Sequence, residues 1–239
     1  MTAVLARRAP VAKLAASGIL SVAALITRDI AALTLIIVVS VALAPAFGIG
    51  AAALLRRAWP VFVAALGIVL TLSLFSADRG GTVLFHFGPF LMTTSVLTAS
   101  LSLALRLLAL ALPALLVFAS TDPTDLADSL IQHAKAPPRF AIGALAAFRL
   151  LGLFRDEWQT IAMARRARGL RRDFFGTAFV LLVQAIRRGV RLAVAMDARG
   201  FDSGRPRSIA RPQPFRPADW LLILGAAALT AAVLLLASR

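Results

Sequence analysis

MARRARGL at residues 163–170 and AMDARGF at residues 195–201 are near-copies of one short pattern, and the rest of the chain is organised around them. Each copy favours a helix and ends in Ala-Arg-Gly followed by a large apolar residue. Glycine suits the left-handed position just past a helix, so we expect each Arg in a last helical turn and each Gly directly after it. A cation there also stabilises the helix dipole, which explains one copy without any function. Two copies in the polar part of an apolar chain indicate a further role.

Composition identifies the class of protein. The 239 residues are 60% hydrophobic, with a mean hydropathy of +0.86. Apolar runs of the length found here exceed what a soluble core of this size needs, so the sequence predicts an all-α integral membrane protein. The net charge is +15, and in a membrane protein we interpret it as a topology signal rather than as nucleic-acid binding. The chain has no cysteine, which excludes disulfides, thiolate metal sites and cysteine nucleophiles.

Five apolar segments predict about five transmembrane helices. We expect about four spans in an N-terminal domain, residues 1–120, a cytoplasmic domain of long helices between the fourth and the last span, residues 121–217, and a C-terminal transmembrane helix in residues 218–239. The predicted spans are residues 11–27, 30–55, 58–77, 105–119 and 221–237, with an interfacial or tilted piece at 90–103.

Individual residues refine these spans. Lys13 must snorkel out of the first one. Pro45 and Gly48 are expected to kink or end the second helix early, and Arg56-Arg57 to close it. Arg106 lies near the outer interface, where a structural anchor and a functional residue are equally plausible interpretations. The basic clusters around Arg8, Arg57 and beyond residue 120 all fall on one side, so we expect the N-terminus to be cytoplasmic.

The polar segment is expected to contain three helices. Asp122 and Pro123 are typical of N-cap and N1 positions and predict a helix from Pro123 to about His133. Two longer helices follow, from Arg139 to about Ala167 and from Phe174 to about Ala198. Their apolar stretches, Phe140–Phe154 and Phe174–Ile186, are interrupted or too short to cross a bilayer. We therefore predict helices at the membrane whose apolar faces are covered by a partner or lipid.

Catalytic signatures are missing from the sequence. There is no P-loop, no dinucleotide fingerprint and no Gly-x-Ser-x-Gly elbow. His86 and His133 have no second ligand at metal spacing, and the acidic residues 122, 125 and 128 fit a helix first turn better than a cation loop. We expect a protein without enzymatic activity, metal site or bound cofactor.

Five short stretches together carry a family resemblance. They are Pro10–Leu14, Thr121–Leu126, Ala167–Gly169, Ala195–Gly200 and Arg216–Trp220. In this order and context they resemble the transmembrane coupling (T) component of energy-coupling-factor importers, the EcfT/CbiQ family of ABC-type vitamin and metal-ion transporters. Val11-Ala12 departs from the more polar residues usual in the first stretch.

The resemblance implies partners and a mechanism in a bacterial or archaeal cell membrane. Two cytoplasmic ABC-type ATPase subunits bind ATP, and a small membrane S component captures the substrate, a vitamin or a transition-metal ion such as cobalt. Arg168 would engage one ATPase and Arg199 the other. Ala167 and Ala198 would allow close approach, while Gly169 and Gly200 close the helix ends. The residues expected to face the S component are Phe140, Leu145, Phe148, Phe154, Phe174, Phe179 and Leu182.

Two other function classes remain open on the residues alone. A stand-alone transporter or channel subunit predicts a polar track within the spans, which apart from Arg106 show almost none. A membrane enzyme or scaffold with a basic cytoplasmic domain predicts binding of anionic lipid or nucleic acid that weakens with salt. The choice of Arg168 among the five Arg of residues 165–172 rests on its flanking Ala and Gly.

Overall fold

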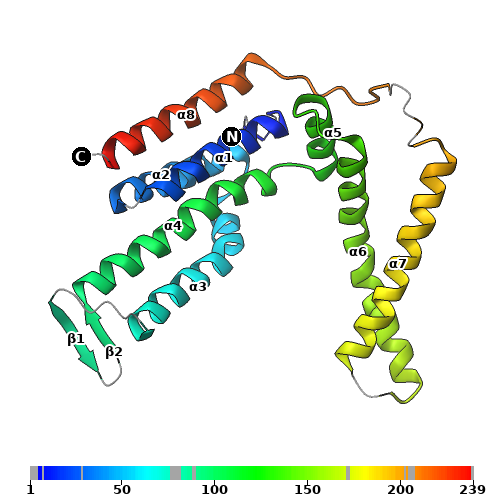
Figure 1. The fold of residues 1–239 in the computed structure, drawn as a ribbon, viewed down its shortest axis with the longest axis horizontal. Helices are drawn as coiled ribbons and strands as arrows, with labels where there is room; N and C mark the ends of the chain where they lie inside the picture. Colours follow the sequence, from blue (N-terminus) through cyan, green and yellow to red (C-terminus); the bar gives the residue numbers. More distant parts are fainter. Residues whose placement is uncertain are drawn as a thin grey trace. The chain divides into compact units, whose positions relative to one another are not determined.

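A computed structural model describes residues 5–6, 8–27, 29–75, 82–87, 90–170, 173–201, 203 and 208–237 (Figure 1). Its elements are α1 (Pro10–Ile26), α2 (Ile30–Leu43), the 3-10 helix η1 (Ala44–Phe47), α3 (Ala51–Phe75), β1 (Val83–Phe87), β2 (Phe90–Thr93), α4 (Thr94–Ala119), α5 (Pro123–His133), α6 (Pro138–Ala167), α7 (Phe174–Ala198) and α8 (Pro217–Ala237). The chain divides into two units. Residues 1–134 and 213–239 form the first, and residues 135–212 form the second.

The first unit is a bundle of apolar helices. By length and composition four of its segments are long enough to cross a membrane: Ile30–Phe47, Ala51–Ser73, Thr94–Ala119 and Pro217–Leu236. The 17-residue α1 is apolar but shorter. Together these helices match the prediction of about five transmembrane helices, and the all-α membrane fold is confirmed apart from the β1–β2 hairpin.

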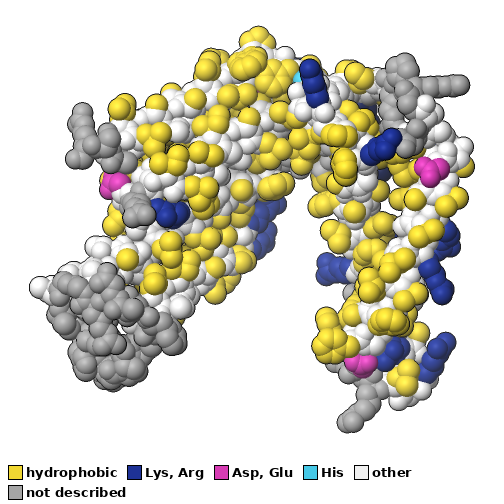
Figure 2. Space-filling model, viewed as in Figure 1, with side chains coloured by type: hydrophobic (Ala, Val, Ile, Leu, Met, Phe, Trp, Pro, Cys, Tyr) yellow, Lys and Arg dark blue, Asp and Glu magenta, His cyan; other side chains and the backbone are white. Residues whose placement is uncertain are grey.

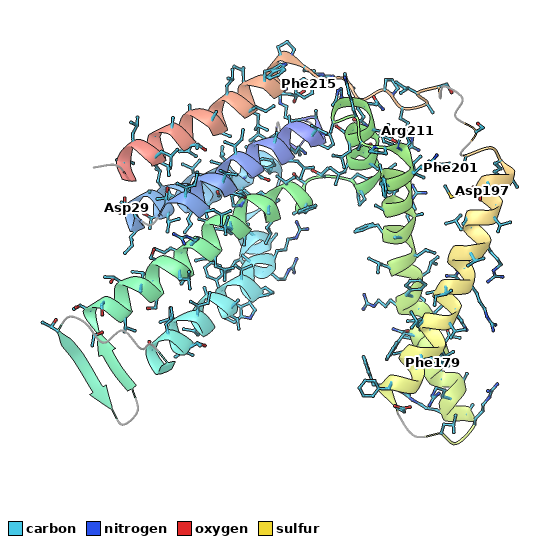
Figure 3. All side chains as sticks on the ribbon, in the orientation of Figure 1. Asp29, Phe179, Asp197, Phe201, Arg211 and Phe215 are labelled. Carbon is cyan, nitrogen blue, oxygen red and sulfur yellow. The ribbon has the colours of Figure 1, made fainter. Side chains whose placement is uncertain are left out.

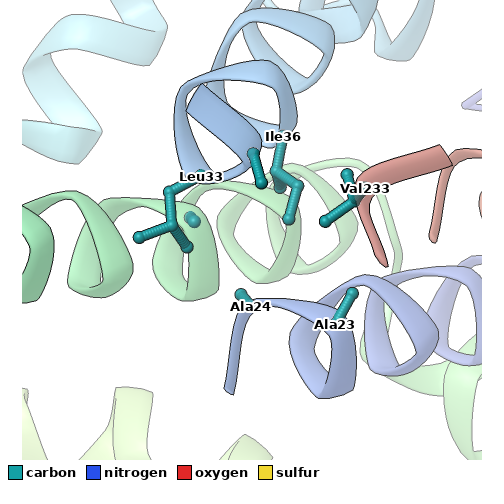
Figure 4. Close-up of a cluster of buried hydrophobic side chains, with 7 residues drawn as sticks. Ala23, Ala24, Leu33, Ile36 and Val233 are labelled. Atoms are coloured by element: carbon teal, nitrogen blue, oxygen red, sulfur yellow. The ribbon is translucent and has the colours of Figure 1, made fainter. Parts of the chain in front are cut away.

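Small side chains let the bundle helices approach closely. Ala23 and Ala24 of α1 face Leu33 and Ile36 of α2 and Val233 of α8, and all five are fully buried (Figure 4). Small residues are favoured at such crossings because helices in lipid associate through close packing rather than through a hydrophobic driving force. The cluster fixes α1, α2 and α8 against α4, which contributes the buried Ala109.

The boundary between the second and third helices differs from the prediction. α2 ends at Leu43, and η1 ends at Gly48, which has a positive φ of 78°. Pro45 and Gly48 thus end the helix early, as expected. The expected boundary at Arg56-Arg57 is wrong, because α3 begins at Ala51 and contains both exposed Arg side chains in its first two turns.

The fourth span is one continuous helix. The predicted interfacial piece at residues 90–103 is wrong: residues 90–93 are strand β2, and α4 runs unbroken for 26 residues from Thr94. The Thr93 hydroxyl caps its start by accepting from the Val96 amide at 3.4 Å. The turn predicted at residues 78–81 and the His86 side chain lie outside the described residues.

Arg106 is held by the end of α1. Its guanidinium donates to the Thr27 carbonyl at 2.6 Å, and Thr27 is the residue that caps α1. A helix C-terminus carries partial negative charge, so this contact stabilises both the cation and the helix end. Two residues later Asp29 (Figure 3) caps α2 by accepting from the amides of Ala31 and Ala32. These contacts favour the anchor interpretation of Arg106.

The polar segment begins as predicted. Asp122 accepts from the Thr124 amide at 2.7 Å and Pro123 is the first residue of α5. This helix packs on α1, because the Val11 amide donates to the Ser129 hydroxyl at 3.3 Å. It therefore belongs to the first unit, whereas the sequence grouped it with the two longer helices.

The second unit is a helical hairpin of α6 and α7, with 30 and 25 residues. Neither helix meets the length and composition of a membrane span. Glu157 of α6 forms an ion pair with Arg188 of α7. Nearer the turn the rings of Trp158 and Phe174 lie 5.2 Å apart. These contacts join the two helices, which cross near the turn in Figure 1 and diverge towards their other ends.

Candidate functional site

Both Ala-Arg-Gly motifs form the same helix ending. At the end of α6, Arg168 is the C-cap and Gly169 has φ +73°. The Gly169 amide donates to the Arg166 carbonyl at 2.9 Å, and the Leu170 amide donates to the Arg165 carbonyl at 3.1 Å. These two bonds are those of a Schellman motif, in which the two residues after the C-cap bond back to the last helical turn.

The end of α7 repeats this geometry. Arg199 is the C-cap and Gly200 has φ +71°. The Gly200 amide donates to Asp197 at 2.9 Å and the Phe201 amide donates to Met196 at 3.0 Å (Figure 3). The predicted glycine positions are confirmed, and each Arg lies one residue past the last helical residue. The two motifs are therefore similar in backbone structure as well as in sequence.

The last turn of each helix is closed by backbone bonds rather than by the Arg side chains. Two of the carbonyls that each helix end leaves open accept here from the amides after the C-cap. Arg168 and Arg199 are both exposed, and no side-chain partner is found for either among the described residues. Two preformed, exposed guanidinium groups at rigid helix ends are suited to binding something outside the chain.

Arg165 differs from Arg168 in this respect, whereas Arg166 is exposed as well. Arg165 forms an ion pair with Asp173 at 3.5 Å, and 24% of its side chain is exposed. Asp173 in turn caps α7 by accepting from the amides of Phe175 and Gly176. Arg165 thus links the end of α6 to the start of α7. Of Arg165 and Arg168, the C-cap Arg168 is therefore the better candidate for an external contact.

The two helix ends lie far apart. α7 returns from the end of α6 through a short turn, so the first motif is near the start of α7 and the second is at its end (Figure 1). At 1.5 Å per residue, the 25 residues of α7 span about 37 Å. A distance of that size exceeds a single side-chain pocket, so the two motifs can bind two separate surfaces.

The predicted apolar faces of α6 and α7 are largely uncovered. Among the residues predicted to face the S component, Phe140, Phe148, Phe174, Phe179 and Leu182 are each more than half exposed. Leu145 and Phe154 are half-buried. Figure 2 shows hydrophobic side chains over the visible face of these helices, with basic side chains along α7. An exposed apolar surface of this size is typical of a site that contacts another protein or the membrane.

The starts of α1 and α8 meet the junction of α4 with α5 in the first unit, through contacts that could not be predicted from local patterns. Lys13 is 1% exposed, and its ammonium donates to the carbonyls of Ala6 at 2.7 Å and Ser120 at 3.1 Å. The expectation that Lys13 snorkels is therefore wrong. Asp219, also 1% exposed, accepts from the amides of Ala9 at 3.2 Å and Arg216 at 2.7 Å. These bonds join the starts of α1 and α8.

Residues after the linker complete this junction. The Gln213 amide donates to the Gln132 side chain at 2.9 Å, and the Gln213 side chain donates to Asp125 at 3.2 Å. The His133 ring contacts the Gln213 carbonyl at 2.8 Å and lies against Phe215. Asp125 and His133 thus serve structural contacts, and the described residues contain no group of three potential metal ligands.

The glycine positions give a direct test of the helix endings. We expect Gly169→Ala with Gly200→Ala to weaken both, because a left-handed conformation costs an L-residue about 1–2 kcal/mol. Exchange of the Leu170 and Phe201 amides, measured by hydrogen–deuterium exchange, should become roughly 5- to 30-fold faster. The control is Gly189→Ala in the middle of α7, where an added Cβ meets nothing within 4 Å and should stabilise the helix. Unchanged exchange at both helix ends would contradict the assignment.

Comparison with known proteins gives a consistent result. The sequence profile of the cobalt transport protein (CbiQ) family matches residues 1–209. The energy-coupling factor transporter transmembrane protein EcfT of Limosilactobacillus fermentum is 30% identical over 174 residues, which cover 64% of each chain. The EcfT proteins of Listeria innocua and Lacticaseibacillus paracasei are each 29% identical, covering 72% and 66% of this chain and 70% and 66% of their own. The chain thus matches about two thirds of the length of these curated relatives.

Proposed function

This chain belongs to the cobalt transport protein (CbiQ) family, and from that membership we propose that it is the transmembrane coupling subunit of an energy-coupling-factor importer. In this role it joins two cytoplasmic ABC-type ATPase subunits to a small membrane S component. The ATPases bind and hydrolyse ATP, and the S component captures a vitamin or a transition-metal ion. The chain itself supplies no catalytic group; it transmits motion from the ATPases to the S component.

The observation that carries the proposal is the pair of Schellman helix ends at Arg168 and Arg199. They present the same group on one helical hairpin, separated by the length of α7, about 37 Å. Two copies of one ATPase, or two related ATPases, offer two similar grooves, which two similar helix ends would match. A receptor for a single ligand has no need of the repetition.

Arginine suits such a contact for a chemical reason. Its planar guanidinium carries five donors, binds carboxylates or carbonyls in pairs and is always charged. Gly169 and Gly200 end each helix sharply behind the Arg, and Ala167 and Ala198 keep the last turn narrow. Each motif is therefore a short rigid tip, which transmits force better than an arginine on a flexible loop.

The apolar faces of α6 and α7 suit the second partner. The S component of the proposed complex is a membrane protein, and an apolar part of its surface would cover these faces. The Glu157–Arg188 ion pair and the Trp158–Phe174 contact hold the two helices together, so that a displacement at either tip moves the surface between them. In the proposed orientation the N-terminus and residues 121–217 are on the cytoplasmic side of a bacterial or archaeal cell membrane.

Affinity purification from the native host tests the proposal. The solubilised wild-type protein should retain two ATP-binding-cassette subunits, or two copies of one, and a small membrane protein that mass spectrometry identifies. The Arg168→Ala, Arg199→Ala double variant should lose the ATPases. Recovery of the same ATPases with both proteins would remove the coupling role from these motifs. Recovery of no ATPase with either would favour a stand-alone transporter subunit, and salt-sensitive binding of lipid or nucleic acid alone would favour a basic scaffold.

A further inference from the structure

A cavity of about 480 Å³ lies within the first unit, between α1, α2, α4 and α8. Its volume is in the range of small-molecule sites. Leu20, Leu43, Leu116 and Leu229 are typical of its lining, which is almost entirely apolar. The cavity is independent of the two Ala-Arg-Gly motifs, which belong to the other unit.

The two cations of the lining are at one end. Arg8 precedes α1 and Lys13 is in its first turn, whereas the apolar lining continues along α1 to Leu20. The starts of α1 and α8 are joined by the bond from the Ala9 amide to Asp219. From that end the lining follows α8 from Ala218 to Leu229, a rise of about 16 Å. The cavity is therefore basic at one end and apolar over the remainder of its length.

Polar groups inside the cavity already have partners, with one exception. The hydroxyls of Ser17 and Ser40 donate to carbonyls of their own helices at 3.2 and 2.7 Å. Lys13 is held by oxygens of residues 6, 120 and 121. The Nε of Arg8 is buried and has no hydrogen-bond partner among the described residues. A buried donor without an acceptor is costly, so an anion beside the Arg8 guanidinium, at the basic end of the cavity, would be stabilising.

From this arrangement we propose that the cavity binds one anionic phospholipid. The phosphate accepts from the Arg8 guanidinium, with Lys13 adding positive charge nearby, and an acyl chain occupies the apolar length beside α8. A neutral apolar ligand leaves Arg8 unpaired, and a small free anion leaves the apolar cavity unfilled. An amphiphile with a negative head satisfies both ends. Asp219 does not oppose the phosphate directly, because it does not line the cavity and its oxygens accept backbone amides.

Native mass spectrometry of the full chain tests the proposal. The delipidated protein in detergent is offered equal amounts of phosphatidylglycerol and phosphatidylcholine. We expect one phosphatidylglycerol to be retained preferentially, and Arg8→Gln to lower that preference about fivefold. Gly225→Leu should lower retention of both lipids, because Gly225 lines the cavity and its Cβ position is open. The control Arg56→Gln removes an exposed cation that does not line the cavity and should change nothing.

Several outcomes would overturn the proposal. These are equal retention of the two lipids by the wild type, a loss of preference in Arg56→Gln as large as in Arg8→Gln, and unchanged retention in Gly225→Leu. Circular dichroism of each variant verifies that it is folded. If Gly225→Leu keeps its lipid but no longer co-purifies with a membrane protein, the cavity belongs to a protein contact instead.

Discussion

Arg168→Ala and Arg199→Ala should each weaken binding of purified ATPase subunits by at least 30-fold, and either change alone should reduce transport to background. Removing one partner of a desolvated, hydrogen-bonded charge pair costs about 2–5 kcal/mol, most of it from the group left unpaired. In the proposed mechanism coupled movement needs both helix ends, so the loss of one would leave an ATPase dimer attached at one side. Binding of the ATPase subunits is measured on the surface-immobilised protein, and transport is measured as substrate uptake into reconstituted vesicles.

Conservative and neighbouring variants make this test specific. Arg168→Lys and Arg199→Lys keep the charge but not the planar fork, so we expect them to recover little of the binding. Arg187→Ala is the matched control, because it removes an exposed Arg of α7 that is not at a helix end. Binding that falls by the same factor in Arg187→Ala, or that is restored fully by Lys, would indicate attraction by total positive charge rather than docking of two helix ends.

Local chemistry made part of the structure predictable. Asp122-Pro123 fixed the start of α5, and Gly169 and Gly200 fixed the ends of α6 and α7, because an N-cap carboxylate and a left-handed C′ residue act within one turn. The exposed apolar residues of the long helices could be identified in the same way, since helix length and interrupted hydropathy are local properties. Both Ala-Arg-Gly ends of the candidate site therefore follow from sequence alone.

Long-range pairing was not predictable. Nothing near Lys13 indicates that oxygens of Ser120 and Thr121, more than 100 residues away, accept from its ammonium, or that Asp219 accepts from an amide 210 residues earlier in the chain. From sequence, Arg106 predicts a break in the fourth span. In the structure its guanidinium donates a hydrogen bond to the Thr27 carbonyl at the end of α1, and α4 continues unbroken. A charge in an apolar run predicts a boundary from local sequence, whereas the folded bundle supplies a partner for that charge.

Lys13→Met should lower the melting temperature of the solubilised protein by about 5–15 °C. Methionine has nearly the same length, but it cannot donate to the carbonyls of Ala6 and Ser120, which an ammonium now bonds at 2.7 and 3.1 Å. Each buried acceptor left without a donor costs about 1–3 kcal/mol, and in a chain of this size 1 kcal/mol corresponds to roughly 2–4 °C. Tryptophan fluorescence follows the transition, because Trp220 lies close to this junction, where its ring contacts Phe215.

The chain supplies its own control for this prediction. Lys135→Met makes the same chemical change at an exposed lysine of the other unit and should leave the melting temperature within about 1 °C. Asp219→Asn should also destabilise the junction, but less, since the amide oxygen of Asn still accepts one of the two backbone bonds. Because Lys13 and Asp219 hold the starts of α1 and α8 and the junction of α4 with α5, both variants loosen one end of the bundle. Equal melting temperatures for Lys13→Met and Lys135→Met would mean that Lys13 is not a structural tie, and its burial would then need another explanation.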